Sequence, residues 1–253
     1  MNKKSESKSN MVKDKKNANN KQLFREVLSK HQAGDLETAE SGYRRLITEY
    51  PSDVDSHSML GTLLLQKGDL YSAEQSLRHA LEIDPKHGIA RANLGRVLHD
   101  KGELDDAIIE YRQVIKNHPN LLDALNNLGC ALREQNKYDE SEDVFQKLIK
   151  QQADYCSAYF NIALSQQASN KSDKAIINYK NAIACNPKYI DAYINLGSLL
   201  LANGNIDDAI DCYSIAQKFE SNNQKLLSNL GNAYFVGGEY AKSEQLSKKE
   251  DRA

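Results

Sequence analysis

Prolines recur along this chain at an interval of 34 residues, and this period constrains the fold more than any other feature. Successive prolines are separated by 34, 34 and 68 residues; they are Pro51, Pro85, Pro119 and Pro187. If each proline is position 32 of a repeat, six complete repeats and a partial seventh fill the chain, over residues 20–53, 54–87, 88–121, 122–155, 156–189, 190–223 and 224–253. A period of about 20 to 50 residues is typical of solenoids and other repeat arrays.

Ten of the thirteen glycines occupy two positions of this repeat. Position 8 lies inside an apolar helical pattern and holds Gly61, Gly95, Gly129, Gly197 and Gly231. Since Gly costs a helix interior about 1 kcal/mol relative to Ala, its recurrence predicts close approach of another helix. Position 15 holds the residues that best tolerate a left-handed cap, and so predicts the end of a first helix; they are Gly34, Gly68, Gly102, Asn136, Asn170, Gly204 and Gly238.

A second helix is predicted to follow, because a small residue at position 20 and a large one at position 24 share one helix face. The large residues are Tyr43, Leu77, Tyr111, Phe145, Tyr179 and Tyr213. Asp105 and Asp207 are expected to cap the start of this helix, and the position-32 proline to end it. Each repeat is therefore a helix hairpin that must stack on the next one to bury its apolar face.

A 34-residue repeat with Leu-Gly at positions 7 and 8, Ala at 20, Tyr or Phe at 24 and Pro at 32 resembles the tetratricopeptide repeat. The stretch NLGRVLHDKGELDDAIIEYRQVIKNHP of the third repeat fits this pattern almost throughout. The resemblance is weaker in the first repeat, which has Glu26 and Val27 in place of Leu-Gly. It implies an all-α, right-handed superhelical solenoid of antiparallel helix pairs over residues 20–253.

Charge and hydropathy exclude some classes of protein. Thirty-three basic and thirty-five acidic residues leave a net charge of −2, which argues against a dedicated nucleic-acid binder. Residues 1–19 are rich in Lys, Asn and Ser, and are expected to be a disordered basic tail. No apolar stretch has the length of a secretory signal or of a membrane span, so a cytoplasmic location is the default expectation.

No catalytic, metal or cofactor motif is recognisable. GxxxxGK[ST], GxGxxG and HExxH are absent, and the six histidines fall at different positions of their repeats. The cysteines have no close-paired spacing, so we expect small core or surface fillers rather than zinc ligands or a redox motif; they are Cys130, Cys156, Cys185 and Cys212. We therefore predict a chain without catalytic residues, metal or cofactor.

In the tetratricopeptide family, positions 2, 5, 6, 9, 12 and 13 of the first helices line the inner curve of the superhelix. By this resemblance, the asparagines at position 6 form a ladder of five, namely Asn93, Asn127, Asn161, Asn195 and Asn229. An Asn side chain offers a donor and an acceptor, which match the N–H and C=O of a peptide backbone. Armadillo proteins and the repeats of O-linked N-acetylglucosamine transferases, which this chain resembles in its repeats only, have similar ladders. Asn is also common at this position generally, so a side chain that only faces water remains the alternative.

Specificity is expected from the variable groove positions. Polar side chains dominate repeats three and four, among them Arg96, Asn126 and Arg133. Apolar side chains dominate repeats five to seven, and they are Phe160, Leu164, Ile194, Leu201, Phe235 and Val236. We predict an extended partner segment that is polar or acidic over repeats three and four and apolar over repeats five to seven. Contact with the short seventh repeat, or self-association, would equally cover the apolar side chains.

Chaperone-binding members of the family grip a C-terminal carboxylate with a Lys at position 5, and this chain has none there. Position 5 holds Phe24, Ser58, Ala92, Asn126, Phe160, Ile194 and Ser228. We therefore predict a non-catalytic scaffold that binds an extended peptide segment and is not a clamp of that type. The alternative is the substrate-recruiting repeat region of a truncated or split transferase, similar to glycosyltransferases, and a third option is a homo-oligomeric structural protein.

Overall fold

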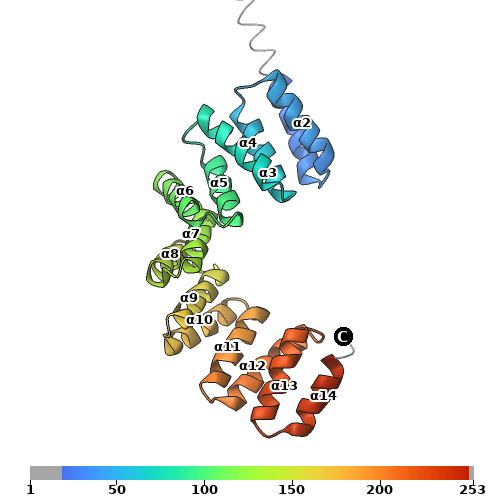
Figure 1. The fold of residues 1–253 in the computed structure, drawn as a ribbon, viewed down its shortest axis with the longest axis vertical. Helices are drawn as coiled ribbons and strands as arrows, with labels where there is room; N and C mark the ends of the chain where they lie inside the picture. Colours follow the sequence, from blue (N-terminus) through green and yellow to red (C-terminus); the bar gives the residue numbers. More distant parts are fainter. Residues whose placement is uncertain (1–18, 251–253) are drawn as a thin grey trace, which may run out of the picture. The chain divides into compact units, whose positions relative to one another are not determined.

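The computed structural model describes residues 19–250, which form helices and connecting turns with no strand among them (Figure 1). The predicted basic tail, apart from residue 19, lies outside the described residues. A helix over residues 19–32 comes first. It is followed by α2 (Leu36–Glu49), α3 (Val54–Gln66), α4 (Leu70–Ile83), α5 (Gly88–Asp100), α6 (Leu104–Asn117), α7 (Leu122–Glu134), α8 (Tyr138–Gln151), α9 (Cys156–Ala168), α10 (Ser172–Cys185), α11 (Ile190–Ala202), α12 (Ile206–Phe219), α13 (Gln224–Val236) and α14 (Tyr240–Glu250). The predicted all-α helical repeat is confirmed.

The helices gather into two compact bodies, which we call the N-terminal body (residues 19–124) and the C-terminal body (residues 125–250). In each body the two helices of a repeat pack side by side, as α3 does with α4 and α11 with α12. First helices of neighbouring repeats also touch, as α3 does α5 and α11 does α13. Each body is therefore a stack of helix pairs in which the first helices share one face.

The left-handed caps predicted at position 15 are confirmed. The glycines at this position have φ between 80° and 82°, and Asn136 and Asn170 have φ of 60° and 59°. At Gly68 the next amide, that of Asp69, donates to the carbonyl of Leu64 over 3.0 Å. This bond and its equivalents in other repeats satisfy carbonyl groups left free at the end of the first helix. The left-handed residue therefore starts the turn into the second helix.

The close approach predicted at position 8 is also confirmed, and its partner is the large residue at position 24 of the same repeat. A Cβ atom on Gly129 would lie 2.5 Å from Cζ of Phe145, and one on Gly197 would lie 2.7 Å from Cε1 of Tyr213. Both rings are buried. An absent side chain on the first helix thus makes room for the ring that fixes the second helix against it.

The two terminal repeats depart from this pairing in different ways. In the first repeat Val27 occupies position 8, and the space for it comes from Gly42, where a Cβ would collide with the Val27 side chain. In the seventh repeat the nearest atom to a Cβ on Gly231 is Cβ of Leu246, at 3.8 Å. Gly231 therefore lacks the tight contact that Gly61, Gly95, Gly129 and Gly197 make with a large side chain of the second helix.

The cap assignments for Asp105 and Asp207 are wrong. Helices α6 and α12 begin at Leu104 and Ile206, so these carboxylates lie in the first helical turn rather than at the cap. There they favour the helix through its dipole. Side-chain caps occur one residue before the helix instead, where Asp69 accepts from the Ser72 amide over 3.1 Å.

Two of the four cysteines form a disulfide, so the expectation that all four are simple fillers is wrong. Cys156, the first residue of α9, and Cys185, the last residue of α10, are joined with a Cα–Cα distance of 5.4 Å. Their bond closes the open end of the fifth hairpin. Cys130 and Cys212 are free thiols, and burial raises the pKa of each, that of Cys212 to about 11.

His57 is a nearly buried titratable group in the N-terminal body, with 6% of its surface exposed. Its Nε2 lies 2.9 Å from the carbonyl oxygen of Pro51, and its ring centroid is 4.5 Å from that of His79. Burial lowers the pKa of His57 from its ordinary value of 6.5; the Pro51 carbonyl opposes this, His79 adds to it and Asp53 opposes it. The fold therefore favours the neutral imidazole.

Replacing Gly197 by Ala is expected to destabilise the protein, because the new methyl group would overlap the Tyr213 ring. Overpacking of this kind costs about 1 to 3 kcal/mol, against a gain of about 1 kcal/mol in helix propensity. Gly231→Ala is the matched control, since the new methyl group would make only ordinary van der Waals contact with Leu246, and the change should be neutral or slightly stabilising. Urea unfolding of both variants measures the difference, and equal stabilities would contradict the packing role assigned to Gly197.

Reduction of the disulfide is expected to lower the free energy of unfolding by about 2 to 4 kcal/mol, because it frees a long loop in the unfolded chain. Denatured, unreduced protein should show two reactive thiols out of four cysteines. The Cys156→Ser/Cys185→Ser variant should unfold like the reduced protein and respond no further to reductant. Four reactive thiols before reduction would contradict the assignment.

Stability should fall as pH drops below about 6.5, because the unfolded chain then protonates His57 while the folded protein resists it. The contribution is fully present above the pKa of the unfolded chain and is lost with a slope of at most about 1.4 kcal/mol per pH unit. Urea unfolding between pH 5 and 8 should show a smaller loss for His57→Gln, which keeps a donor toward Pro51. Identical profiles for the two proteins would exclude His57 as a source of the pH dependence.

Candidate functional site

The candidate site lies on the face made by α7, α9, α11 and α13 in the C-terminal body, which we call the first-helix face. It carries four of the five predicted ladder residues, Asn127, Asn161, Asn195 and Asn229. All four side chains are partly exposed. Asn93, also partly exposed, lies on α5 in the N-terminal body. Four rungs of the predicted ladder therefore belong to one compact body.

Two of the ladder amides have a partner within the protein. The side-chain nitrogen of Asn93 donates to Oγ1 of Thr62 over 2.7 Å, and that of Asn195 donates to the carbonyl oxygen of Asp191 over 2.8 Å. These bonds fix the orientation of each amide. At Asn195 the side-chain oxygen is consequently left as the group for an incoming donor.

A hollow of about 330 Å³ opens on the first-helix face where three successive repeats meet. Its polar lining comes from Arg133 of α7, Tyr138 at the start of α8, Gln167 of α9 and Asn195 of α11. Leu164 and Ala168 add apolar surface. Concave sites of this size with a few convergent polar groups are typical ligand pockets.

Arg133 is the charged group of this hollow. Its Nε atom is buried without a hydrogen-bond partner, and a buried polar group left unpaired costs about 1 to 3 kcal/mol. The guanidinium also lies close enough to the Cys130 thiol to oppose the rise that burial produces in the pKa of that thiol. Arg133 therefore brings a positively charged guanidinium to the lining of the hollow, while its Nε atom lies below the surface.

The other polar groups of the hollow are oriented by bonds inside the protein. The Tyr179 hydroxyl donates to Oε1 of Gln167 over 2.6 Å, and the Tyr138 hydroxyl donates to Oδ1 of Asn136 over 2.5 Å. Because its oxygen is engaged, Gln167 offers its N–H groups to a ligand. Sequence analysis did not identify Gln167 or Tyr138. Gln167 occupies position 12 of its repeat, as Arg133 does, so this groove position could have indicated it. No repeat pattern distinguishes Tyr138.

The structure divides the predicted apolar groove residues into core and surface. Ile194 is only 2% exposed and belongs to the core of the C-terminal body, so the expectation that it faces a partner is wrong. Phe160 is partly buried, with its ring centroid 4.9 Å from that of Tyr189. Leu164 and Leu201 are partly buried against the same core. The packing of neighbouring helices therefore uses most of these side chains.

The predicted polar groove residues are not brought into one cluster. Arg96 is exposed on α5 in the N-terminal body. Asn126 is partly buried on α7, and its side-chain oxygen has no hydrogen-bond partner. Of the two polar predictions in the C-terminal body, only Arg133 lines the hollow.

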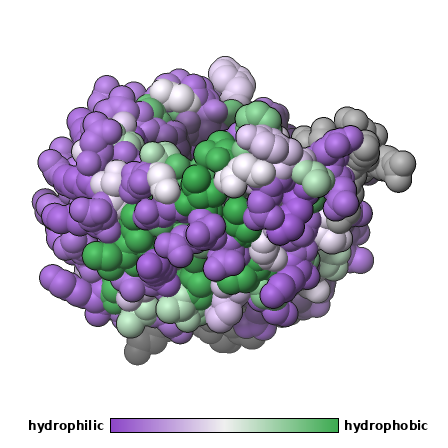
Figure 2. Space-filling model, turned by 90° about the horizontal axis from the view of Figure 1, so that it is seen from below, coloured by the Kyte–Doolittle hydropathy of each residue, from purple (hydrophilic) through white to green (hydrophobic). Residues whose placement is uncertain are grey.

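An exposed apolar group lies where α13 meets α14. Phe235, Val236 and Tyr240 are 59%, 53% and 63% exposed, and the rings of Phe235 and Tyr240 are 5.3 Å apart. Figure 2 shows hydrophobic residues gathered on a mainly hydrophilic face of the molecule. Of the predicted apolar residues, Phe235 and Val236 are therefore the accessible ones.

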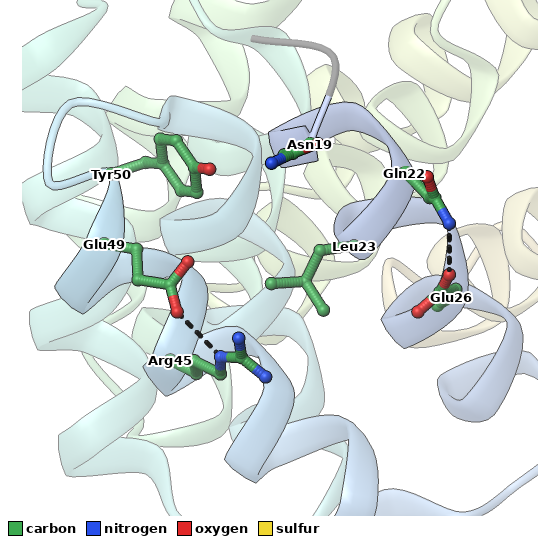
Figure 3. A pocket seen from close by; sticks show the side chains of 7 residues that line it. All are labelled: Asn19, Gln22, Leu23, Glu26, Arg45, Glu49 and Tyr50. Atoms are coloured by element: carbon green, nitrogen blue, oxygen red, sulfur yellow. Dashed lines mark hydrogen bonds and ion pairs between the residues drawn. The ribbon is translucent and has the colours of Figure 1, made fainter. Parts of the chain in front are cut away.

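A second hollow, of about 350 Å³, lies in the N-terminal body between the helix over residues 19–32 and α2 (Figure 3). Within it Arg45 pairs with Glu49 over 2.7 Å, and Gln22 donates to Glu26 over 3.1 Å. These groups satisfy one another along their own helices, as Figure 3 shows. The hollow therefore offers a ligand fewer unsatisfied groups than the one at Arg133.

Neither metal ligation nor membrane insertion is indicated within residues 19–250. No group of three or more His, Cys, Asp or Glu side chains there is arranged to hold a metal ion. None of the helices in this range combines the length and apolar character needed to cross a bilayer. The absence of metal and cofactor stays a prediction from sequence.

Tetratricopeptide repeat family models match most of the chain. One matches residues 24–88, 59–121, 93–155 and 126–190, and another matches residues 178–211. Comparison with curated protein sequences gave no match.

Solved structures share the fold at low identity. A tetratricopeptide repeat protein from Parabacteroides merdae is 19% identical, with a TM-score of 0.72 over 92% of each chain. PilF of Pseudomonas aeruginosa is 24% identical, with a TM-score of 0.68 over 79% of this chain and 90% of that one. YrrB, described as a TPR protein with an unusual peptide-binding site, is 18% identical, with a TM-score of 0.59 over 73% of this chain and 95% of its own. The resemblance to transferase repeats stays a prediction.

Proposed function

The chain belongs to the tetratricopeptide repeat family, and we propose that it is a non-catalytic scaffold that binds an extended segment of a partner protein on the first-helix face. The hollow between α7, α9 and α11 carries this proposal, because three successive repeats contribute polar groups to it. A site assembled from several repeats suits an elongated ligand. The description of YrrB as having a peptide-binding site is consistent with this use of the fold.

Spacing supports an extended ligand. Packed helices lie about 8 to 10 Å apart, and an extended chain advances about 3.3 Å per residue. Successive ladder asparagines would therefore meet about every third residue of a bound segment. Backbone recognition of this kind places little demand on the partner's sequence, so selectivity would come from the hollow at Arg133 and the exposed apolar group at Phe235 and Val236.

The cellular location of this scaffold is inferred from its disulfide rather than from its fold. The disulfide between Cys156 and Cys185 favours an oxidising compartment, in contrast to the cytoplasm predicted from sequence. Self-association through Phe235, Val236 and Tyr240 is the alternative use of the apolar group, and light scattering of the purified chain would detect it.

Peptide selection tests the proposal. Random 12-residue peptides are displayed on phage with their C-termini fused to the coat protein, and are selected on the immobilised full chain. The enriched peptides are then made synthetically. The Asn127→Ala/Asn161→Ala/Asn195→Ala variant should bind them at least about tenfold more weakly, because three hydrogen bonds of about 0.5 to 1.5 kcal/mol each are lost. Ala favours the helix more than Asn does, so circular dichroism should be unchanged.

Asn181→Ala is the matched control, since Asn181 is an exposed residue of α10, a second helix. It should leave peptide affinity unchanged. Failure to enrich any peptide, or equal binding by the wild type and the triple variant, would contradict backbone recognition by the ladder.

A further inference from the structure

Arg133 is the positively charged residue that lines the hollow. Two other arginines pair with a carboxylate four residues earlier on their helix, Arg44 with Glu40 and Arg78 with Glu74. The residues three and four positions from Arg133 are Gly129, Cys130, Asn136 and Lys137, none of which is acidic. The guanidinium of Arg133 consequently has no carboxylate neighbour one helical turn away.

The residues that line the hollow beside Arg133 also matter for which ligand group fits there. The oxygen of Gln167 already accepts from the Tyr179 hydroxyl, so its amide nitrogen remains to donate. The Tyr138 hydroxyl already donates to Asn136. Arg133 and Gln167 therefore present N–H groups in one hollow, and an ionised carboxylate, which only accepts hydrogen bonds, matches them.

Asn195 supplies a hydrogen-bond acceptor to the same hollow. Its nitrogen donates to the Asp191 carbonyl, which leaves its oxygen to accept from a ligand. A peptide residue with a carboxylate side chain carries both required groups, because its own backbone N–H is a donor. Leu164 and Ala168 offer apolar surface for the methylene groups of that side chain.

We propose that this hollow is an anchor subsite for an acidic side chain, Asp or Glu, within the extended segment that the first-helix face binds. The proposal rests on the function proposed above and assigns the chemistry of one position in the ligand. Arg133 and Gln167 hold the carboxylate, while Asn195 holds the backbone of the same residue. The subsite therefore binds a carboxylate on a side chain within a continuing peptide. It differs in this from a site that binds the C-terminal carboxylate of a peptide.

The test uses the peptides selected on the full chain, whose C-termini are fused to the phage coat and therefore present no free carboxylate. Enriched peptides should share Asp or Glu at one position. Synthetic versions with an amidated C-terminus are compared with versions in which that residue is Asn or Gln. Arg133→Gln should weaken binding of the acidic peptide about ten- to a hundredfold and binding of its neutral version by clearly less, because a neutral amide oxygen accepts a weaker hydrogen bond from Arg133 than a carboxylate does.

Three further variants control this measurement. Arg133→Lys keeps the charge without the planar donors and should recover only part of the affinity. Gln167→Ala should weaken the acidic peptide more than the neutral one. Lys180→Gln removes one positive charge from the exposed part of α10 and should have no such preference. The Nε–H resonance of Arg133, assigned by its loss in Arg133→Gln, should shift with the acidic peptide and not with the neutral one.

The outcomes separate this inference from the function on which it rests. Peptides that bind through the asparagines but show no acidic preference, or that bind Arg133→Gln as well as wild type, would overturn the subsite alone. Binding that requires a free C-terminal carboxylate would overturn it in favour of an end-gripping site. If no peptide is enriched, the proposed function fails and the subsite with it.

Discussion

The contact between a bare position-8 glycine and the large side chain at position 24 sets the geometry of four inner repeats, those with Gly61, Gly95, Gly129 and Gly197. At Gly95, Gly129 and Gly197 the ring of the second helix occupies the volume of a missing Cβ. This buried contact holds the two helices of a repeat together. The outward-facing positions of the first helix are therefore not needed for this packing. The first-helix face can therefore vary in sequence while the stack beneath it is maintained.

Much of the fold could be predicted because its determinants repeat. The left-handed caps at Asn136 and Asn170 and the glycine-to-ring contacts depend on one residue type at one phase, and each copy reinforces the others. The disulfide was not predicted, because Cys156 and Cys185 occur in one repeat only and lie 29 residues apart. They stand at the start and the end of one helix hairpin, and the repeat pattern does not show how close these two ends come. A feature that occurs once leaves no periodic signal.

The candidate site was less predictable for a related reason. Position 5 was expected to face the groove throughout, yet Ile194 is buried while Phe160 remains partly exposed. How far such a side chain is covered depends on the neighbouring repeat, which a single column of residues does not specify. Arg133 was identified from its column, but its unpaired Nε and the orientation of Gln167 follow from bonds to particular neighbours.

The disulfide also affects how the stack would come apart. Repeat arrays tend to open from their ends, because terminal repeats have a neighbour on one side only. Among the described repeats, the seventh opens most easily, because Gly231 makes no tight contact with a large side chain of the second helix. A covalent closure of the fifth hairpin would oppose the spread of such opening to α9. The side of the Arg133 hollow formed by α9 would thus keep its shape while the seventh repeat opens and closes.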